Sequence, residues 1–431
     1  MALTYEQAIE FLFPRTTTIK FGLETTRALL ASLGNPHELM PCVHVGGTNG
    51  KGSVSTLVAE ALAAAGWRVG LYTSPHLVSF RERVRVDGVA ISEAAVAMWT
   101  DRLSRLIHQR AATFFEATTA IAFADFAARG AEIAVIEVGL GGRLDSTNVV
   151  RPLVSAVTKI ELDHVKYLGD TLEDIAREKA GIAKAGAPFV VGETRPELVA
   201  VLRRAAACAV RGQDREAVPD IRVVPRDALW AGPLCLAGAH QRRNAAVAEA
   251  VLRALPPPYR PADTAIAEGF ARARIAGRLD RRGRWLFDVA HNPDGIRALA
   301  RAIPDLDLPR PLHALVSILG DKEWPEMLVL LDGVIDRGVL TRAPTAASRG
   351  WDFDWLGRWL RDPTRPRPRA AWSLVPGFRE AIATAQEGAG TVLVTGSFHT
   401  VGDVMRELAI EVCSYPLSTV GHQPSPLSSA P

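Results

Sequence analysis

The first residues that could do chemistry form a glycine-rich run, Val45-Gly-Gly-Thr-Asn-Gly-Lys-Gly-Ser53. Glycines let consecutive backbone amides turn toward one anion, and a lysine in the same run can neutralise phosphate charge. The run departs from the usual Gly-x-x-x-x-Gly-Lys-Ser/Thr pattern, because Gly52 separates Lys51 from Ser53. It predicts a site for a nucleoside triphosphate. The alternative is a plain glycine turn before a helix.

Two acidic positions follow short apolar runs, at the points where strands would end. Glu137 closes Ala134-Val-Ile-Glu137, and Asp163-His164 follows the apolar run that ends at Ile160. In an open α/β sheet, the carboxyl ends of the strands face the crevice where ligands bind. An unpaired carboxylate there is costly, and a divalent cation is a natural partner for it. The alternatives are a salt-bridged strand end for Glu137 and a structural role for His164.

These residues need a frame of alternating strands and helices. Glycine or polar turns separate short β-branched runs from amphipathic segments such as residues 53–65, which predicts an α/β fold with a largely parallel sheet. Strands are predicted in a first set at residues 42–45, 69–72, 133–138, 154–158 and 188–191, and in a second set at residues 285–289, 314–319, 333–341 and 391–395.

The two sets of strands predict two domains. We expect a phosphate-loop ATPase domain over residues 1–276 and a smaller Rossmann-like α/β domain over residues 284–412. The short, basic, glycine-bounded segment 277–283 is interpreted as the hinge between them. The Ser- and Pro-rich residues 413–431 predict a disordered tail.

The composition argues against several classes of protein. Among 431 residues, 50 are basic and 47 acidic, and the arginines are scattered, so no nucleic-acid partner is expected. No apolar stretch is long enough to span a bilayer, and the N-terminus does not resemble a signal peptide. The four cysteines lie far apart without a Cys-x-x-Cys pair. A cytoplasmic protein without a membrane partner is therefore expected.

Several motifs occur in an order that resembles one family. They are Gly47-Thr-Asn-Gly-Lys-Gly-Ser53, Tyr72-Thr-Ser-Pro-His-Leu77, Phe115-Glu116, Glu137-Val-Gly-Leu-Gly-Gly-Arg-Leu-Asp145, Leu162-Asp-His164, Ala176-Arg-Glu-Lys-Ala-Gly181, Asp288-Val-Ala-His-Asn-Pro293 and Gly396-Ser-Phe-His-Thr400. The chain resembles the folylpolyglutamate synthases, especially the bacterial bifunctional dihydrofolate synthase/folylpolyglutamate synthases, within the wider muramyl (Mur) ligase group. The resemblance covers about residues 3–410.

The resemblance implies the roles of particular residues. The implied ATP contacts are Asn49, Gly50, Lys51, Gly52 and Ser53 on the phosphate, Asn244 near the adenine, and Arg278 and Asp288. The implied ligands of two magnesium ions are Ser74, Glu137, His164 and a carbamate formed from CO2 on Lys179. Lys51, Glu137, His164 and Lys179 form the implied catalytic set. By its pattern alone, Lys179 is a solvated lysine on a helix.

The resemblance also implies two further contact sets. His291 and Ser397 are the implied glutamate-side residues. The implied pterin-binding residues are Thr18, Ile19, Lys20, Phe21, Thr113, Phe115, Leu144, Asp145 and Ser146. For Phe115, simple core packing is the alternative.

The activity implied by the resemblance is an ATP-dependent ligation. The carboxylate of dihydropteroate or of a reduced folate would be phosphorylated and then joined to the amino group of L-glutamate, by a monomeric enzyme. Three alternatives remain open. The first is a folylpolyglutamate synthase that cannot use dihydropteroate. The second is another Mur-type amino-acid ligase, although a phosphate loop starting near residue 46 leaves no room for a uridine-nucleotide domain before it. The third is a nucleotide switch or carrier subunit without ligase activity.

Overall fold

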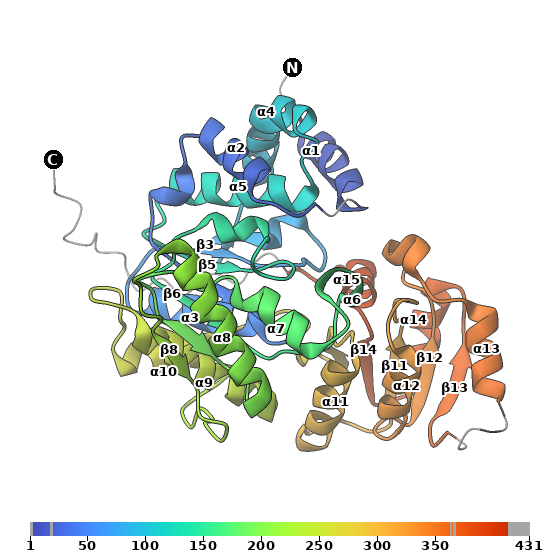
Figure 1. The fold of residues 1–431 in the computed structure, drawn as a ribbon. Coiled ribbons are helices and arrows are strands. Elements are labelled where there is room, and N and C mark those ends of the chain that lie inside the picture. Colours follow the sequence, from blue (N-terminus) through green and yellow to red (C-terminus); the bar gives the residue numbers. More distant parts are fainter. Residues whose placement is uncertain (1–2, 18–19, 363, 365–367, 413–431) are drawn as a thin grey trace.

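The computed structural model describes residues 3–17, 20–362, 364 and 368–412. Two sheets, one in each half of the chain, organise the molecule, and the second half lies beside the first (Figure 1). Among the described residues, no helix is both long enough and apolar enough to cross a membrane. The tail predicted over residues 413–431 lies outside the described residues.

The first sheet has eight strands in the order β4-β3-β2-β5-β1-β6-β7-β8. Its central strands are parallel, and β1 and β5 are buried over their whole length, as expected when helices cover both faces of a sheet. The strands are β1 (Cys42–Gly46), β2 (Val69–Tyr72), β3 (Val84–Val86), β4 (Val89–Ala90), β5 (Ile133–Glu137), β6 (Val154–Val157), β7 (Phe189–Val191) and β8 (Ile221–Val223).

Helices cover the two faces of this sheet. One face carries α3 (Lys51–Ala64), α9 (Ala239–Ala254) and α10 (Asp263–Arg272) in one apolar cluster. Another apolar cluster packs the short α6 (Val165–Leu168), α7 (Leu172–Ala180) and α8 (Pro196–Gln213) against the sheet. The remaining helices, α1 (Tyr5–Leu12), α2 (Glu24–Ser32), α4 (Glu93–Gln109) and α5 (Phe114–Ala128), form a layer at the top of Figure 1.

The second sheet has six strands in the order β13-β12-β11-β14-β10-β9, all parallel except β9. The strands are β9 (Asp280–Arg282), β10 (Trp285–Phe287), β11 (Leu312–Val316), β12 (Arg337–Leu340), β13 (Ala371–Leu374) and β14 (Thr391–Thr395). The helices are α11 (Pro293–Ala302), α12 (Trp324–Asp332), α13 (Phe353–Arg361), α14 (Phe378–Gln386) and α15 (Phe398–Glu407). Apolar clusters lie on both faces of this sheet, so it has a core of its own.

Most predicted elements are present, and the α/β fold with two mostly parallel sheets is confirmed. The helix predicted at residues 53–65 begins earlier, at Lys51, because Gly50 takes a left-handed conformation (φ 93°) at its N-cap. Part of the predicted hinge forms β9, which pairs with β10 in the second sheet. The hinge and the domain boundaries stay predictions.

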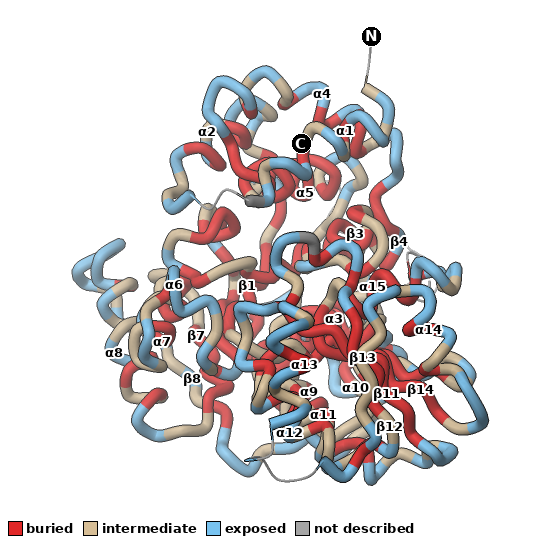
Figure 2. Tube along the Cα trace, turned by 90° about the vertical axis from the view of Figure 1, so that its right-hand side faces the viewer, coloured by how far each residue is buried: buried red, intermediate tan, exposed pale blue. Residues whose placement is uncertain are grey.

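An apolar contact joins the two halves. The strands form buried cores in both halves (Figure 2). Leu77, from the first half, packs with Val289, Val401 and Val404 of the second half. A Cβ atom added to Gly402 of α15 would lie 2.1 Å from the carbonyl oxygen of Leu77, so only glycine permits this close approach.

Candidate active site

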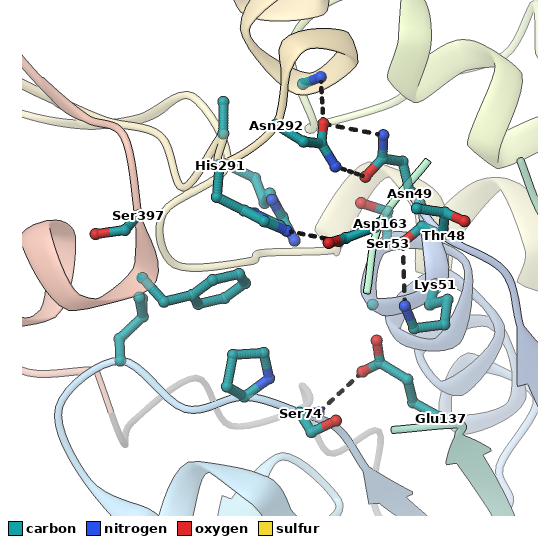
Figure 3. Close-up of a pocket in the computed structure, with 18 of the residues that line it drawn as sticks. Thr48, Asn49, Lys51, Ser53, Ser74, Glu137, Asp163, His291, Asn292 and Ser397 are labelled. Carbon is teal, nitrogen blue, oxygen red and sulfur yellow. Dashed lines mark hydrogen bonds and ion pairs between the residues drawn. The ribbon is translucent and has the colours of Figure 1, made fainter. Parts of the chain in front are cut away.

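The carboxyl ends of the central strands of the first sheet open into a cavity of about 1620 Å³, and the second half contributes to its wall. Figure 3 shows the phosphate loop residue Lys51 and the carboxylate of Glu137 on one side, with His291 and Ser397 on the other. The cavity thus joins the phosphate loop to the residues expected on the glutamate side.

The glycine-rich run is a loop between β1 and α3, as predicted. Gly47 has φ 138°, and a Cβ atom there would lie 1.9 Å from Oγ1 of Thr158. Nζ of Lys51 donates to the carbonyl oxygen of Thr48 (3.1 Å). Lys51 is also the first residue of α3, where the helix dipole and unpaired amides favour an anion. This geometry favours an anion at the loop over a plain glycine turn, and the assignment of phosphate stays a prediction.

Glu137 ends β5 and is buried, with 3% of its surface exposed. Its Oε2 accepts from the amide of Ser74 (3.0 Å), and a Cβ atom on Gly52 would lie 3.7 Å from both carboxylate oxygens. Burial raises the pKa of Glu137, while the charge of Lys51 opposes that rise. A cation beside this carboxylate would favour its ionised form.

Asp163 connects the two halves of the cavity. Its Oδ1 lies 2.5 Å from Nζ of Lys322, and its Oδ2 lies 3.6 Å from Nε2 of His291. Burial alone would raise the pKa of Asp163, but the contact with His291 and the charges of His164 and Lys322 hold it well below its usual range. The sequence pattern did not predict Lys322, which lies far along the chain without a motif around it.

His164 lies at the N-cap of α6 in a left-handed backbone conformation (φ 52°), which is uncommon for a non-glycine residue. Its side chain is 46% exposed and lines the cavity. Burial, together with the charges of Lys322 and Lys51, lowers the pKa of His164 to about 4 even though Asp163 raises it. The imidazole is therefore neutral at pH 7 and has a lone pair available for a ligand.

Lys179 is not a solvated lysine, because only 5% of its surface is exposed. Its Nζ donates to the carbonyl oxygen of Gly47 in the phosphate loop (2.8 Å). Burial first, and then the charge of Lys51, lower the pKa of Lys179 to about 7. A large fraction of the amine is therefore neutral near physiological pH.

The predicted nucleotide contacts beyond the loop also line the cavity. Oδ1 of Asn244 lies 2.5 Å from the position a Cβ atom on Gly50 would take. The guanidinium carbon of Arg278 lies 5.4 Å from the centre of the Phe398 ring. Asp288 accepts from the amides of Leu279 and Ala290, both at 3.0 Å, and burial raises its pKa.

The predicted glutamate-side residues lie together in the second half. Nδ1 of His291 lies 2.9 Å from the carbonyl oxygen of Val289, and its ring centroid is 5.5 Å from that of Phe398. Ser397 caps α15 by accepting from the amide of Thr400 (3.1 Å). Both residues line the cavity. All predicted ATP, metal and glutamate residues therefore share one cavity, while their individual roles stay predictions.

The predicted pterin residues are placed differently. Thr18 and Ile19 lie outside the described residues. The others do not line the cavity: Lys20, Phe21, Thr113, Phe115, Leu144, Asp145 and Ser146. Two of them have structural partners, because Thr113 caps α5 and Asp145 accepts from the amides of Leu140 and Thr147. The pterin assignment stays a prediction.

The first half lines the cavity with other residues instead. Phe13, Phe80 and Phe114 form an aromatic wall, and His76 and Arg83 lie against it. The sequence pattern did not single out these side chains as site residues. His76 stands inside the quoted Tyr72–Leu77 motif, which was the available signal, whereas Arg83 had none.

Polar contacts also join the phosphate loop to the second half. Nδ2 of Asn49 donates to Oδ2 of Asp294 (2.8 Å), and Nδ2 of Asn292 donates to Oδ1 of Asn49 (3.2 Å). Nζ of Lys159 lies 2.5 Å from Oδ1 of Asp294. Figure 3 shows Asn49 and Asn292 facing each other. The position of α11 is thereby coupled to the loop.

The potential metal ligands of the cavity are single donors rather than a cluster. In the part of the chain that the structure describes, no three His, Cys, Asp or Glu side chains are grouped as a metal site. The cavity offers isolated donors instead: the Ser74 hydroxyl, the Glu137 carboxylate and the His164 imidazole. Magnesium typically binds through one or two carboxylates together with substrate phosphates.

Comparison with known proteins agrees with this geometry. The family model of the Mur ligase middle domain matches residues 45–210, and that of the Mur ligase glutamate ligase domain matches residues 272–398. The two halves of the chain therefore match two domains of the Mur ligase class.

The chain is similar over most of its length to two curated bacterial proteins, each named dihydrofolate synthase/folylpolyglutamate synthase. The Bacillus subtilis protein is 32% identical over 95% of this chain and 100% of its own. The Escherichia coli protein is 35% identical over 90% of this chain and 91% of its own. The chain belongs to the folylpolyglutamate synthase/dihydrofolate synthase family.

Two haloarchaeal relatives are longer. They are named probable bifunctional folylpolyglutamate synthase/dihydropteroate synthase, and the chain spans about half of their length, 50% in Haloferax volcanii and 49% in Halobacterium salinarum.

Solved structures give the same family. The structure of E. coli FolC in complex with DHPP and ADP superposes with a TM-score of 0.79 at 32% identity, covering 95% of this chain and 98% of that one. A bifunctional folylpolyglutamate synthase/dihydrofolate synthase, solved with Mn, AMPPNP and L-glutamate, superposes with a TM-score of 0.76 at 30% identity, covering 95% of this chain and 98% of that one.

Proposed function

We propose that this protein is an ATP-dependent ligase that joins the carboxylate of dihydropteroate or of a folate to the amino group of L-glutamate. One observation carries the proposal: the phosphate loop and Glu137 share a cavity with Asp288 and His291 of the second half. A phosphoryl donor, an acid and an amine need a common space of this kind. The names of the bacterial relatives and the ligands of their structures support the same reading.

The reaction proceeds in two steps. A carboxylate oxygen of the acceptor attacks the γ-phosphorus of ATP, the bond to the bridging oxygen breaks, and ADP leaves. The amine of glutamate then attacks the acyl phosphate, releasing phosphate and a proton as the amide forms. Lys51 and the amides at the start of α3 stabilise the charge on the transferring group. The second half holds glutamate near the acid and excludes water.

We propose that Ser74, Glu137 and His164 bind magnesium together with the phosphates of ATP. Bound magnesium would supply positive charge against the β- and γ-phosphates. We also propose that Lys179 reacts with CO2, losing a proton to form a carbamate. Its burial and lowered pKa favour the neutral amine that this reaction requires. The carbamate would give the site a second oxygen-donor anion.

Purified protein with ATP and labelled glutamate tests the ligase proposal, with dihydropteroate or tetrahydrofolate as the acceptor. We expect labelled product with both acceptors and one ADP released per amide bond formed. Lys51→Ala should abolish turnover, because the phosphates lose their cation. Lys166→Ala, an exposed lysine outside the cavity wall, is the matched control.

The outcome separates the alternatives. ATP hydrolysis without a glutamate-dependent product would contradict the ligase and favour a nucleotide switch. Product with tetrahydrofolate alone would indicate a monofunctional folylpolyglutamate synthase. We also propose that the protein is cytoplasmic, in line with the scattered cysteines of the sequence. We propose in addition that it is a monomer, and size-exclusion chromatography with light scattering tests this oligomeric state.

A further inference from the structure

An arginine in the cavity wall has no anionic partner among the residues that the structure describes. Arg83 ends the short 3-10 helix Phe80–Arg83, lines the cavity, and has only 8% of its surface exposed. In the described part of the chain, no carboxylate lies within ion-pair distance of its guanidinium, and the hydrogen bond from its side chain is the one that Nε donates to Nδ1 of His76 (2.8 Å). A buried guanidinium that faces a cavity in this way is suited to binding an anion.

The neighbouring acid is already engaged. The carboxylate of Glu82 accepts from the amides of Leu77, Val78 and Ser79 at 3.0, 2.8 and 2.6 Å. Glu82 therefore fixes the loop that carries His76 rather than pairing with Arg83. Burial lowers the pKa of the Arg83 guanidinium, and the charges of Tyr72, Glu82 and Glu137 only partly offset that effect.

His76 supplies a second donor beside Arg83. Its Nδ1 accepts from Arg83, so a neutral ring carries its proton on Nε2. His76 also lines the cavity. The Arg83 Nη groups and the His76 Nε2 proton together suit the two oxygens of a carboxylate.

Aromatic rings surround this pair. The Arg83 guanidinium carbon lies 5.1 Å from the centre of the Phe114 ring, and the His76 centroid lies 5.8 Å from Phe13 and 6.4 Å from Phe80. A ligand whose carboxylate lies near Arg83 would therefore place its adjoining group against an apolar, aromatic wall. A carboxylate carried by a flat ring, as in a benzoate or a benzoylglutamate, matches both surfaces.

We propose that Arg83 and His76 hold a carboxylate of the acceptor substrate. This inference rests on the proposed ligase function. The carboxylate has two sources of the same chemistry. It is the reacting carboxylate, which dihydropteroate also has, or the α-carboxylate of a glutamyl group, which only a folate has.

Steady-state kinetics of Arg83→Gln and Arg83→Lys tests this. We expect Arg83→Gln to raise the KM of the acceptor by about tenfold or more, because a buried charged hydrogen bond is lost, and to leave the KM of ATP nearly unchanged. Arg83→Lys should recover only part of the loss, since a lysine lacks the planar fork. His76→Asn keeps an acceptor for Arg83 but removes the second donor, so it should raise the same KM by a smaller factor.

Arg81→Gln is the matched control. Arg81 stands in the same 3-10 helix, donates to the carbonyl oxygen of Ile91, pairs with Glu93 and does not line the cavity. Thermal unfolding and ADP binding verify that each variant is folded. Calorimetric titration of wild type and Arg83→Gln with dihydropteroate and with tetrahydrofolate, both in the presence of ADP, repeats the comparison without turnover.

Each outcome decides something. Weaker binding of both acceptors assigns Arg83 to the reacting carboxylate, and weaker binding of tetrahydrofolate alone assigns it to the α-carboxylate. Unchanged binding of both acceptors by a folded Arg83→Gln protein overturns the inference, and so does a rise confined to the KM of ATP. A wild-type protein that binds the acceptors without forming product would count against the ligase function and leave the anchor testable by calorimetry.

Discussion

At the scale of single residues, burial changes what the ionisable groups of the cavity can do. Lys179 and Glu137 are both almost completely buried. Burial lowers the pKa of Lys179 and raises the pKa of Glu137, so it favours the neutral form of each side chain. The two shifts have opposite chemical consequences. The neutral lysine has the lone pair that the proposed reaction with CO2 requires, whereas the carboxylate needs a nearby cation to stay ionised.

Lys179→Ala should reduce glutamate incorporation on the order of 100-fold, as expected when a ligand beside the metal is lost. Wild-type activity should fall in CO2-depleted buffer and recover with bicarbonate, while the variant should not respond. Arg177→Ala is the control, because Arg177 stands on the same helix and pairs with Asp174 at the surface. Full activity of Lys179→Ala would remove the carbamate from the proposal.

A second buried base makes stability depend on pH. His44 of β1 is completely buried and bonded to Thr147 (2.8 Å), and burial, followed by the charge of Lys184, lowers its pKa to about 3. Below pH 6.5 the unfolded chain binds a proton that the folded protein does not. Stability from this group is therefore complete above pH 6.5 and is lost as the pH falls, by roughly 2 kcal/mol at pH 5.

Urea unfolding of His44→Gln between pH 7 and pH 5 measures this loss. The variant should lose less stability than wild type over that interval, whatever its stability at pH 7. His108→Gln removes an exposed histidine and should follow the wild-type curve. Parallel curves for His44→Gln and wild type would show that the imidazole does not titrate as expected.

At the scale of elements, the phosphate loop depends on glycine for space as well as for backbone conformation. Gly47 combines a positive φ with a position where a Cβ atom would clash with Thr158. Gly66 also has a positive φ (93°), but nothing lies within 4 Å of the Cβ atom it would gain. Substitutions at Gly47 and Gly66 therefore separate the effect of the steric clash from the effect of the backbone conformation.

Gly47→Ala should weaken ADP binding by roughly tenfold or more, because the loop must move to relieve the clash. Gly66→Ala should cost about 1 kcal/mol of stability with unchanged ADP affinity. Isothermal titration and urea unfolding measure the two quantities. Equal ADP affinity for Gly47→Ala and wild type would show that the loop tolerates the side chain.

The helices and strands also show which parts of the structure can be predicted from the sequence. The strand, glycine loop and helix around Lys51 were predictable, because local conformation and charge point to the same structure. The helical layer of α1, α2, α4 and α5 was not, nor was the partnership of Arg83 with His76. Those contacts depend on how distant segments pack, which hydrophobic periodicity does not encode. The predicted pterin residues that the structure describes match the motif although they do not line the cavity, and their role stays a prediction.

At the scale of the whole molecule, both halves of the chain line the cavity, so its shape depends on how they are held together. Asp294 is central to this, since it accepts from Asn49 of the phosphate loop and pairs with Lys159. Burial would raise the pKa of Asp294, but the hydrogen bond and charge of Lys159 lower it, so the pair is ionised at neutral pH.

Asp294→Ala should lower kcat by about tenfold, because the second half is held less firmly against the loop. Glu326→Gln, which breaks an exposed pair with Arg297 inside the second half, should leave kcat unchanged. Small-angle scattering should show a larger radius of gyration for Asp294→Ala. Unchanged kcat and radius would show that the contact does not control closure.

Leu77 and Gly402 have a consequence for how this chain can be divided. Within the Tyr72–Leu77 motif, Ser74 lies beside Glu137 in the first half. Leu77, at the end of the motif, packs in the core of the other half against Gly402, which has no side chain to block it. We expect that cutting the chain near residue 277 exposes the apolar side chain of Leu77 to water in one fragment. The other fragment would keep an unfilled gap beside Gly402. Each fragment should therefore aggregate more readily than the intact chain.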